Sequence, residues 1–288
     1  MMTLEQLSIF IAVAEREHLT NGANAIGLSP SAASAAIKSL EAFYEIRLFD
    51  RVGRRIELTR EGRALLAEAR QTMAQVRNTE AVLSELGSLR TGSLDLAASQ
   101  TIANYWLPPR LLRFQQRFGG ISIRFEAANT DAVAAAVVDG RSELGFVEGN
   151  IDEPALSVSP IVHDRLVVVA AAGASVIDPD LRWIMRERGS GTRSVFEAAM
   201  AQAGFDPARL HIALVLPTNE AVLSAVRAGT CAAALSEMVV EPFVRSGELQ
   251  VLPIDLPPRQ FSILKHRERR LSAAARQFEA MCREEVRG

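Results

Sequence analysis

Four clusters of small polar residues stand where an apolar run of the chain gives way to a helical pattern. Each cluster offers hydroxyl or amide groups beside the backbone N–H groups that a helix leaves unpaired at its N-terminus, a setting that binds carboxylates and inorganic oxyanions. Taken singly, each cluster has a simpler interpretation, because Ser, Thr and Asn are ordinary N-caps. The clusters are Ser99-Gln100-Thr101, Asn129-Thr130, Gly189-Ser190-Gly191-Thr192 and Thr218-Asn219.

The stretch "RERGSGTRS" is the most suggestive of the four, because two glycines around Ser190 expose backbone amides and Arg186, Arg188 and Arg193 add positive charge. It is not a P-loop, since no Gly-Lys-Ser/Thr follows. Glu148, after the apolar run "LGFV", is a further candidate for the same site, although a solvated strand end is the simpler interpretation. We expect a small anion or a carboxylate metabolite to bind at Ser99, Gln100, Thr101, Asn129, Glu148, Ser190, Gly191, Thr192, Thr218 and Asn219.

Catalytic and metal-binding patterns are missing from the sequence. The histidines His18, His163, His211 and His266 are scattered and share no metal-ligand spacing. There is no G-x-S-x-G elbow, no CxxC pair and no GxGxxG after a strand. The sequence therefore predicts a protein that is not an enzyme and that uses no metal or cofactor.

From residue 92 onward, short apolar runs alternate with helical patterns, and this alternation occurs twice. The segment Asn129-Thr130-Asp131-Ala132-Val133 can be laid over Thr218-Asn219-Glu220-Ala221-Val222, which also brings Gly140 onto Gly229. A repeat of this kind predicts two similar α/β lobes. Short apolar strands between helices indicate largely parallel, buried sheets, whose ligands gather at the carboxyl ends of the strands. The polar clusters are expected at those strand ends.

The N-terminal part predicts a helix-turn-helix. An amphipathic helix over residues 4–16 is followed by a short helix that ends at Gly27, where a left-handed C-cap is expected. A third helix then begins with Ser29 as N-cap and Pro30 as its first residue. Its inward side is apolar, whereas its outward side presents Ser31, Ser34, Ala35 and Lys38.

Small residues on that outward side let a helix backbone lie close to the floor of the DNA major groove, where Ser and Lys donate to bases and phosphates. The alternative is a face that packs on a neighbouring helix. A β-hairpin wing is predicted next, with Arg51, Arg54 and Arg55 at its tip to bind flanking phosphates. Residues 1–90 nevertheless carry as many acidic as basic side chains, so one copy should bind DNA weakly and a dimer is expected.

The dimer has a candidate in a long helix that starts after Thr59. A seam of apolar residues recurs along it at spacings typical of a coiled coil that packs against a second copy. The alternative is an amphipathic helix packed inside one domain. The seam consists of Leu66, Ala69, Met73, Val76 and Leu83, and the stretch "GSLRTGS" after it predicts a hinge.

Composition limits the function classes further. The chain has 288 residues and a net charge of -2, so overall charge does not indicate a nucleic-acid binder. Cys231 and Cys282 lie far apart and are expected to be buried, reduced thiols. No signal peptide or membrane span is visible near the N-terminus, and we expect a cytoplasmic protein.

The motifs "LEQLSIFIAVAE", "GLSPSAASAAIKSLEAFYEIRLFDR" and "ELTREGRALLAEA", followed by two α/β lobes, resemble the LysR-type transcriptional regulators over the whole chain. The resemblance implies an N-terminal, all-α winged helix-turn-helix with a long linker helix, and a two-lobed α/β effector domain of the periplasmic-binding-protein type. It also implies a homodimer through the linker helix, assembly into tetramers that bend double-stranded promoter DNA, and a small effector in the cleft between the lobes.

Carried over by position, the family's DNA contacts fall on Ser31, Ser34 and Lys38 in the recognition helix and on the three wing arginines. We also expect Ser29 and Pro30, at the start of that helix, to bind DNA. Its effector positions fall on Ser99, Thr101, Asn129, Thr192 and Thr218. This sequence departs from the family pattern at Pro30, at Ala35 and in the pair Asn21-Gly22. The first two departures predict thin direct base readout with more weight on groove shape, and the third should cost the second helix some stability.

The expected domains are a winged helix-turn-helix over residues 1–58 and a linker helix and hinge over residues 59–91. Lobe I is expected over residues 92–161 and 267–288, and lobe II over residues 162–266. Two other function classes are kept as alternatives: a cytoplasmic small-molecule binding protein without a DNA role, and an enzyme on an α/β scaffold. Either would survive removal of residues 1–90, whereas a regulator would lose DNA binding and keep its ligand.

Overall fold

A computed structural model describes residues 2–52, 55–85, 92–173 and 181–287 of the chain. They form two compact units, one made of residues 1–83 with 139–141, the other of residues 84–138 and 142–288. The hinge was expected on residues 87–93, of which 87–91 lie outside the described residues and 92–93 begin a strand. In the described ranges no helix combines the length and the apolar character needed to cross a bilayer.

The N-terminal unit is a helix-turn-helix with a wing and a long helix, as predicted. Helices α1 and α3 pack around Phe10 and Leu40, and Val13, Ala23 and Ile37 form a second core beside them. The wing strands pair antiparallel. The elements are α1 (Leu4–Ala14), α2 (Leu19–Ala25), α3 (Pro30–Tyr44), β1 (Phe49–Val52), β2 (Arg55–Leu58) and α4 (Arg60–Glu85).

Local sequence signals fix the ends of these helices. Thr3 and Gln6 form a capping box before α1. The Ser29 hydroxyl accepts a hydrogen bond from the Ala32 amide at 3.2 Å, with Pro30 at the first helical position. Gly27 adopts the predicted left-handed conformation with φ of 69°. The start of α3 is therefore set by Ser29 and Pro30, the residues from which it was predicted.

The N-terminal half of the expected dimer seam is used inside the unit. Leu66, Ala69 and Met73 of α4 pack in the core that contains Leu7 and Phe10 of α1. The internal alternative is therefore correct for this half, because these residues cover the apolar side of α1. The side chain of Leu83 lies outside the described residues.

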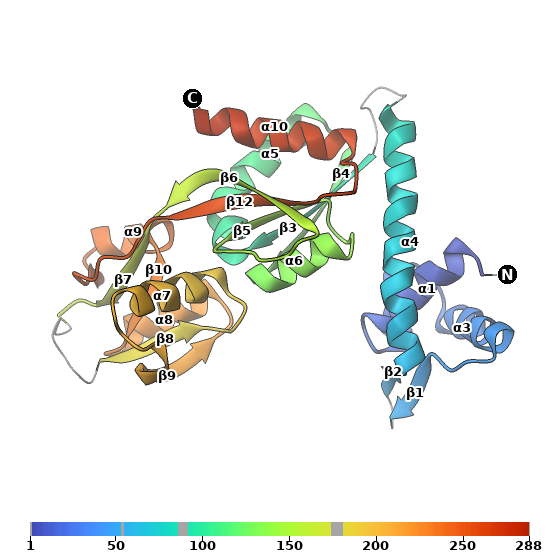
Figure 1. Cartoon of the computed structure of the whole chain (residues 1–288), viewed down its shortest axis with the longest axis horizontal. Helices are drawn as coiled ribbons and strands as arrows, with labels where there is room; N and C mark the ends of the chain where they lie inside the picture. The colour runs from blue at the N-terminus through green and yellow to red at the C-terminus, as the bar shows by residue number, and fades with distance from the viewer. Residues whose placement is uncertain (1, 53–54, 86–91, 174–180, 288) are drawn as a thin grey trace. The chain divides into compact units, whose positions relative to one another are not determined.

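The second unit contains two five-stranded sheets, which define lobe I and lobe II (Figure 1). Lobe I consists of β3 (Gly92–Ser99), the π-helix η1 (Ile102–Trp106), α5 (Pro108–Arg117), β4 (Ile121–Ala128), α6 (Thr130–Val138), β5 (Leu144–Glu148), β6 (Leu156–Asp164), β12 (Arg259–His266) and α10 (Ala273–Arg287). Lobe II consists of β7 (Leu166–Ala171), β8 (Arg182–Arg186), α7 (Gly191–Gln202), the 3₁₀-helix η2 (Pro207–Arg209), β9 (His211–Leu216), α8 (Asn219–Ala228), β10 (Ala232–Ser236), α9 (Glu237–Arg245) and β11 (Leu249–Val251).

The two sheets share one topology, as the repeat predicted. Lobe I has the order β4-β3-β5-β12-β6 and lobe II the order β9-β8-β10-β7-β11. The expectation of largely parallel sheets is correct only in part. Strands β3, β4 and β5 run parallel, but β12 is antiparallel to both neighbours, and β7 is antiparallel to β10 and β11. Each sheet is mixed because one strand, β12 in lobe I and β7 in lobe II, runs against both of its neighbours. The chain crosses between the lobes after β6 and again before β12.

The expected lobe boundary at residue 266 is wrong for the same reason. Strand β12 pairs with β5 and β6 and so belongs to lobe I, and β6 continues to Asp164. Lobe II therefore ends before Arg259. The run "FSILK" is apolar enough to lie in either sheet, and only its pairing decides which.

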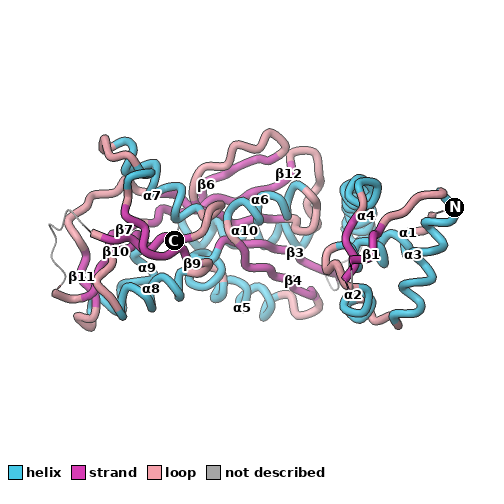
Figure 2. Tube along the Cα trace, turned by 90° about the horizontal axis from the view of Figure 1, so that it is seen from below, coloured by secondary structure: helices cyan, strands magenta, loops and turns pink. Residues whose placement is uncertain are grey.

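Helices cover both faces of each sheet (Figure 2). In lobe I, α5 and α10 pack on one face around Phe114 and Phe278, and α6 covers the other through Val133 and Val137. In lobe II, α7 covers one face through Phe196, whereas α8 and α9 cover the other. Cys231 and Cys282 are both buried, as expected.

Gly22 of α2 is required by close packing. A Cβ built on Gly22 would lie 2.6 Å from Val13 Cα and 2.9 Å from the Ala12 carbonyl oxygen. We therefore predict that Gly22→Ala lowers the free energy of unfolding of the helix-turn-helix by about 1–3 kcal/mol, despite the higher helix propensity of alanine. Urea unfolding of the full chain, followed by far-ultraviolet circular dichroism, measures this. The exposed Asn24→Ala change on the same helix is the control, and equal stability of the two variants would contradict the prediction.

Candidate DNA interface and ligand site

The predicted inward and outward sides of α3 are found in the structure. Ser31, Ala35 and Lys38 are exposed and Ser34 is half-buried. The opposite side is buried through Ala33, Ile37 and Leu40. The Ser29 hydroxyl is occupied as the N-cap and lies 3.0 Å from the Ser31 hydroxyl. The alternative in which the small-residue face packs on another helix does not hold within this unit.

The wing is described only in part. Arg51 in β1 is exposed. Arg54 and the side chain of Arg55 lie outside the described residues. The exposed helix face and the Arg51 guanidinium together provide hydroxyls and positive charge, which are the groups that bind the edges of bases and phosphates.

The candidate ligand site is centred on Glu148, the last residue of β5. Its side chain is 1% exposed. The Ser99 hydroxyl donates to Oε2, and the hydroxyls of Thr101 and Thr192 each lie 3.4 Å from Oε1. Ser99 and Thr101 belong to lobe I, whereas Thr192 is in the first turn of α7 in lobe II. The expectation of a solvated strand end is wrong, because three hydroxyls from both lobes enclose this carboxylate.

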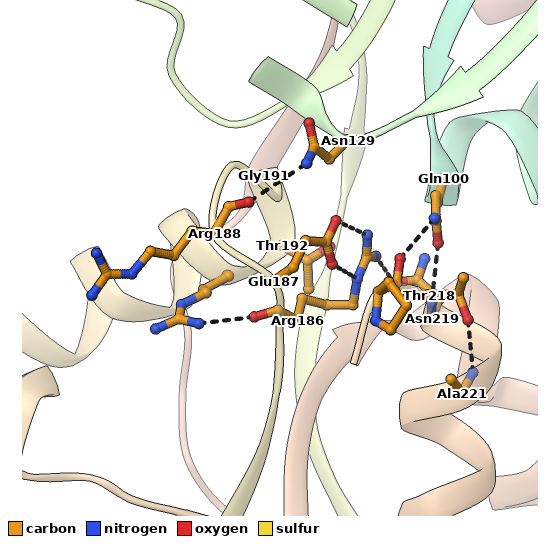
Figure 3. A network of polar contacts seen from close by, with 12 residues as sticks. Gln100, Asn129, Arg186, Glu187, Arg188, Gly191, Thr192, Thr218, Asn219 and Ala221 are labelled. Carbon is orange, nitrogen blue, oxygen red and sulfur yellow. Dashed lines mark hydrogen bonds and ion pairs between the residues drawn. The ribbon is translucent and has the colours of Figure 1, made fainter. Parts of the chain in front are cut away.

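A second contact between the lobes runs through Asn219 at the start of α8. Its Nδ2 donates to the Thr101 hydroxyl at 3.0 Å, and its Oδ1 accepts from Nη1 of the buried Arg186. Figure 3 shows Gln100 directed from lobe I toward Asn219, and the backbone N–H of Asn219 donates to Gln100 Oε1 at 3.2 Å. Glu187 binds Arg186 through two hydrogen bonds of 2.8 and 2.9 Å. The charge of Arg186, predicted to serve the site, is therefore largely balanced by Glu187.

The glycine-rich loop meets lobe I directly. The Gly191 amide donates to the Thr130 hydroxyl at 3.0 Å, and that hydroxyl donates to the Glu148 carbonyl at 3.2 Å. A Cβ at Gly191 would lie 2.1 Å from the Glu148 carbonyl oxygen, so only glycine permits this approach. The Ser190 amide donates to the Glu187 carbonyl. The expectation that these two amides are open to a ligand is therefore wrong for this structure.

Two predicted site residues are used as helix caps. Asn129 accepts from the Ala132 amide at 2.9 Å, and Thr218 accepts from the Ala221 amide at 3.0 Å. They stand at equivalent positions of the repeat. The simpler interpretation as N-caps is found at both positions, although Asn129 Nδ2 also lies 3.5 Å from the Arg188 carbonyl oxygen across the lobes.

A further contact between the lobes lies beside η1. Asn104 Nδ2 and the Tyr105 hydroxyl approach Glu220 Oε1 at 2.9 and 3.3 Å. Burial, and then the negative charge of Glu220, raise the pKa of the Tyr105 hydroxyl. Tyr105 is therefore a hydrogen-bond donor that helps hold α8 against lobe I.

A buried ion pair joins β6 to β12, and no sequence pattern predicted it. Arg259 Nε lies 2.6 Å from Asp164 Oδ2, and the two side chains are 2% and 1% exposed. Ser236 donates to the other carboxylate oxygen at 2.7 Å, and Arg259 Nη1 donates to the Thr192 hydroxyl at 3.1 Å. Glu148, Thr192, Arg259 and Asp164 thus form one continuous polar network. The sequence signal was a charged residue shortly before an apolar run, Asp164 in "VHDRLVVV" and Arg259 in "PPRQFSIL".

Comparison with known protein families decides the identity of the chain. The family described as "Bacterial regulatory helix-turn-helix protein, lysR family" matches residues 4–63, and "LysR substrate binding domain" matches residues 87–287. The second match alone spans more than half of the chain. The chain belongs to the LysR family. The resemblance stated from the sequence is therefore confirmed.

Similar proteins include other LysR regulators. The Escherichia coli (strain K12) protein named "Uncharacterized HTH-type transcriptional regulator YeiE" is 32% identical, over 98% of this chain and 97% of its own. Full-length CbnR, solved with its target DNA, shares the fold with a TM-score of 0.67 at 21% identity, over 98% and 99% of the two chains. The Synechocystis PCC6803 CcmR regulatory domain, solved in complex with 2-PG, is 25% identical with a TM-score of 0.62, over 69% of this chain and 99% of that one.

The buried ion pair of this LysR protein has a testable consequence. We predict that Asp164→Asn lowers the free energy of unfolding of the effector domain by about 3–5 kcal/mol, because it leaves the Arg259 charge buried and uncompensated. Urea unfolding followed by tryptophan fluorescence measures this, since Trp106 and Trp183 both lie in that domain. Glu241→Gln, which removes the exposed pair with Arg245, is the control and should change stability by less than about 1 kcal/mol. Equal effects of the two changes would contradict the assignment.

Proposed function

We propose that this LysR regulator binds promoter DNA through α3 and the wing, and that a small anion or carboxylate metabolite between the lobes changes how it binds. The observation that carries the proposal is the convergence of three hydroxyls from both lobes on the buried Glu148 carboxylate. A cluster of hydroxyl donors at the N-terminus of a helix is suited to an anionic oxygen. In this structure the Glu148 carboxylate occupies the position that an anionic oxygen of a ligand would take.

An anionic effector must compete with Glu148 for these donors. Two carboxylates that share one buried site repel each other strongly, because the surroundings screen charge poorly. Binding therefore moves the Glu148 side chain away from the hydroxyls of Ser99, Thr101 and Thr192. Since Thr192 belongs to the opposite lobe, the exchange of one carboxylate for another changes how the lobes are held together, which is the differential contact that a switch requires.

DNA binding is proposed from the family and from the exposed face of α3. CbnR, the similar regulator solved with its target DNA, supports it, and the CcmR complex with 2-PG supports a small-molecule effector. Because residues 1–90 carry no net charge, we propose a homodimer through the linker helix, and a homotetramer, to supply the phosphate contacts that one copy lacks. The protein is proposed to act in the cytoplasm and to catalyse no reaction.

The ligand site makes a paired prediction. Sulfate, phosphate and succinate, titrated calorimetrically into the full-length protein, should include at least one that binds. Thr192→Val should weaken that binding about 10-fold, because a hydroxyl donor is lost. Glu148→Gln should strengthen it about 10-fold or more, because the competing charge is removed while the side-chain shape is kept.

The exposed Thr230→Val change in lobe II is the matched control and should leave the affinity unchanged. Absence of binding by all three anions to both the wild type and Glu148→Gln would overturn the proposed effector class. The same conclusion follows if Thr192→Val and Thr230→Val behave alike.

A further inference from the structure

A basic cavity lies in lobe I, where the chain passes from β12 into α10 (Figure 1). Its volume is about 520 Å³, which is within the range of small-molecule sites. It is lined by the end of β12, by residues that follow that strand, by Ser157 of β6 and by the N-terminal half of α10. His266 in its wall lies five residues along β12 from Phe261, the partner of Glu148, and an extended strand covers about 16 Å over that length. The cavity is therefore separate from the candidate ligand site.

The charge of this cavity is strongly positive. Among its described lining residues, four arginines and one lysine stand against a single carboxylate, that of Glu279. This carboxylate is already paired, because Lys265 Nζ and Arg283 Nη2 lie 3.1 and 2.9 Å from Glu279 Oε1. The whole chain has a net charge of -2, so this concentration of cations is a local feature.

Two of the guanidinium groups are open to a ligand. Arg267 and Arg270 both line the cavity and are both exposed. Among the described residues, the Arg267 side chain bonds only to the Pro154 carbonyl oxygen, at 3.0 Å, and the Arg270 side chain has no hydrogen bond or ion pair. Glu268, which separates them in the sequence, pairs with neither in this part of the chain. Both positive charges are therefore unbalanced and within reach of an anion from solvent.

The backbone that carries these two arginines is held in place. Arg269, between them, donates to the carbonyl oxygens of Val137 and Val138 at 2.8 and 2.7 Å, and so caps the C-terminus of α6. The backbone N–H of Arg267 donates to the Ala155 carbonyl oxygen at 2.9 Å. Because the segment is already anchored to lobe I, a ligand does not have to order it, which reduces the entropic cost of binding.

The lining residues also indicate the class of ligand. Leu271 is the one apolar residue among the described residues of the wall, so the cavity does not select an apolar body. A phosphate group carries close to two negative charges at neutral pH and offers three oxygens to the planar N–H groups of arginine. A carboxylate carries one charge and two oxygens. Two unpaired guanidinium groups in one small cavity therefore suit a phosphate group better than a carboxylate.

We propose that this cavity binds a small phosphorylated metabolite through Arg267 and Arg270. The two guanidinium groups bind the phosphate oxygens, and the fixed backbone of residues 267–269 keeps the two arginines beside the same cavity. This site is argued without the proposed effector at Glu148 and does not depend on it.

Inorganic pyrophosphate is the probe, and malonate, a small dicarboxylate, is its control. Both are titrated calorimetrically into the full-length protein at about 0.15 M salt, which screens loosely held charges. We expect pyrophosphate to bind about 10-fold or more tightly than malonate, because it carries more charge and more acceptor oxygens. Equal binding of the two would show a cationic surface without phosphate recognition and overturn the proposed class. No binding of pyrophosphate at millimolar concentration would overturn the site.

Two matched substitutions test the location. Arg270→Gln removes an unpaired charge of the cavity and should weaken pyrophosphate binding about 10-fold. Arg209→Gln removes an exposed arginine of lobe II that does not line the cavity, and should leave binding unchanged. Both side chains are exposed, so both variants should fold like the wild type. Equal effects of the two substitutions on pyrophosphate binding would overturn the assigned location.

His266 in the cavity wall reports occupancy. Burial, and then the positive charge of Arg269, lower the pKa of its ring, whereas Glu268 and Glu153 raise it. A polyanion bound beside the ring favours the protonated form, so pyrophosphate should raise the pKa of His266 in the wild type and not in Arg270→Gln. Proton NMR titration of the ring signal measures this. A pKa of His266 that saturating pyrophosphate leaves unchanged would contradict binding in this cavity.

Two further outcomes separate this site from other anion sites. Thr192→Val should leave pyrophosphate binding intact, and its loss in that variant, with retention in Arg270→Gln, would place pyrophosphate at the Glu148 site and overturn this one. Weaker binding of promoter DNA by Arg270→Gln, without any binding of pyrophosphate, would assign the arginines to a nucleic-acid backbone and also overturn it. Neither result alters the sulfate and succinate titrations that test the proposed function.

Discussion

The carboxylate of Glu148 is buried between two lobes and depends on hydroxyls from both of them. A carboxylate removed from water must be hydrogen-bonded, so the donors of Ser99, Thr101 and Thr192 have to stay within reach of it. This requirement links the end of β5 to the first turn of α7 and brings Gly191 against the Glu148 backbone. The position of one lobe on the other is therefore set largely by a polar network, whereas each lobe is held by its own apolar core.

The same network reaches the strands that cross between the lobes. Thr192 accepts from Arg259, and Arg259 is paired with Asp164 on the neighbouring strand. The Glu148 carboxylate is therefore connected through a single hydroxyl, that of Thr192, to the ion pair that joins β6 to β12. A buried ion pair is weak evidence for stability in itself, but it is costly to break and so defines one arrangement of its surroundings. Under the proposed function, this arrangement is what the effector alters.

The sequence predicted the parts whose signals are local. Ser29, Pro30 and Gly27 set the limits of the turn and of α3. The repeat that superposes Asn129 on Thr218 predicted two similar lobes, and the structure shows that their sheets have the same strand order. Features that depend on distant pairing were missed. The run that forms β12 was assigned to the wrong lobe, and the Arg259–Asp164 pair joins residues that no spacing rule connects. A solvated strand end was the simpler interpretation of Glu148, because a charged residue after an apolar strand is usually exposed to solvent.

The central claim is that an anion at the Glu148 site changes how this protein binds DNA. DNase footprinting on the DNA upstream of its own gene, at fixed salt, tests this most directly, with the full-length protein alone and with the tightest-binding anion. We expect a long protected region whose extent changes on adding the anion, no such change in Thr192→Val, and loss of protection in Lys38→Ala. A footprint that the anion leaves unaltered, although calorimetry shows the site to be filled, would contradict it.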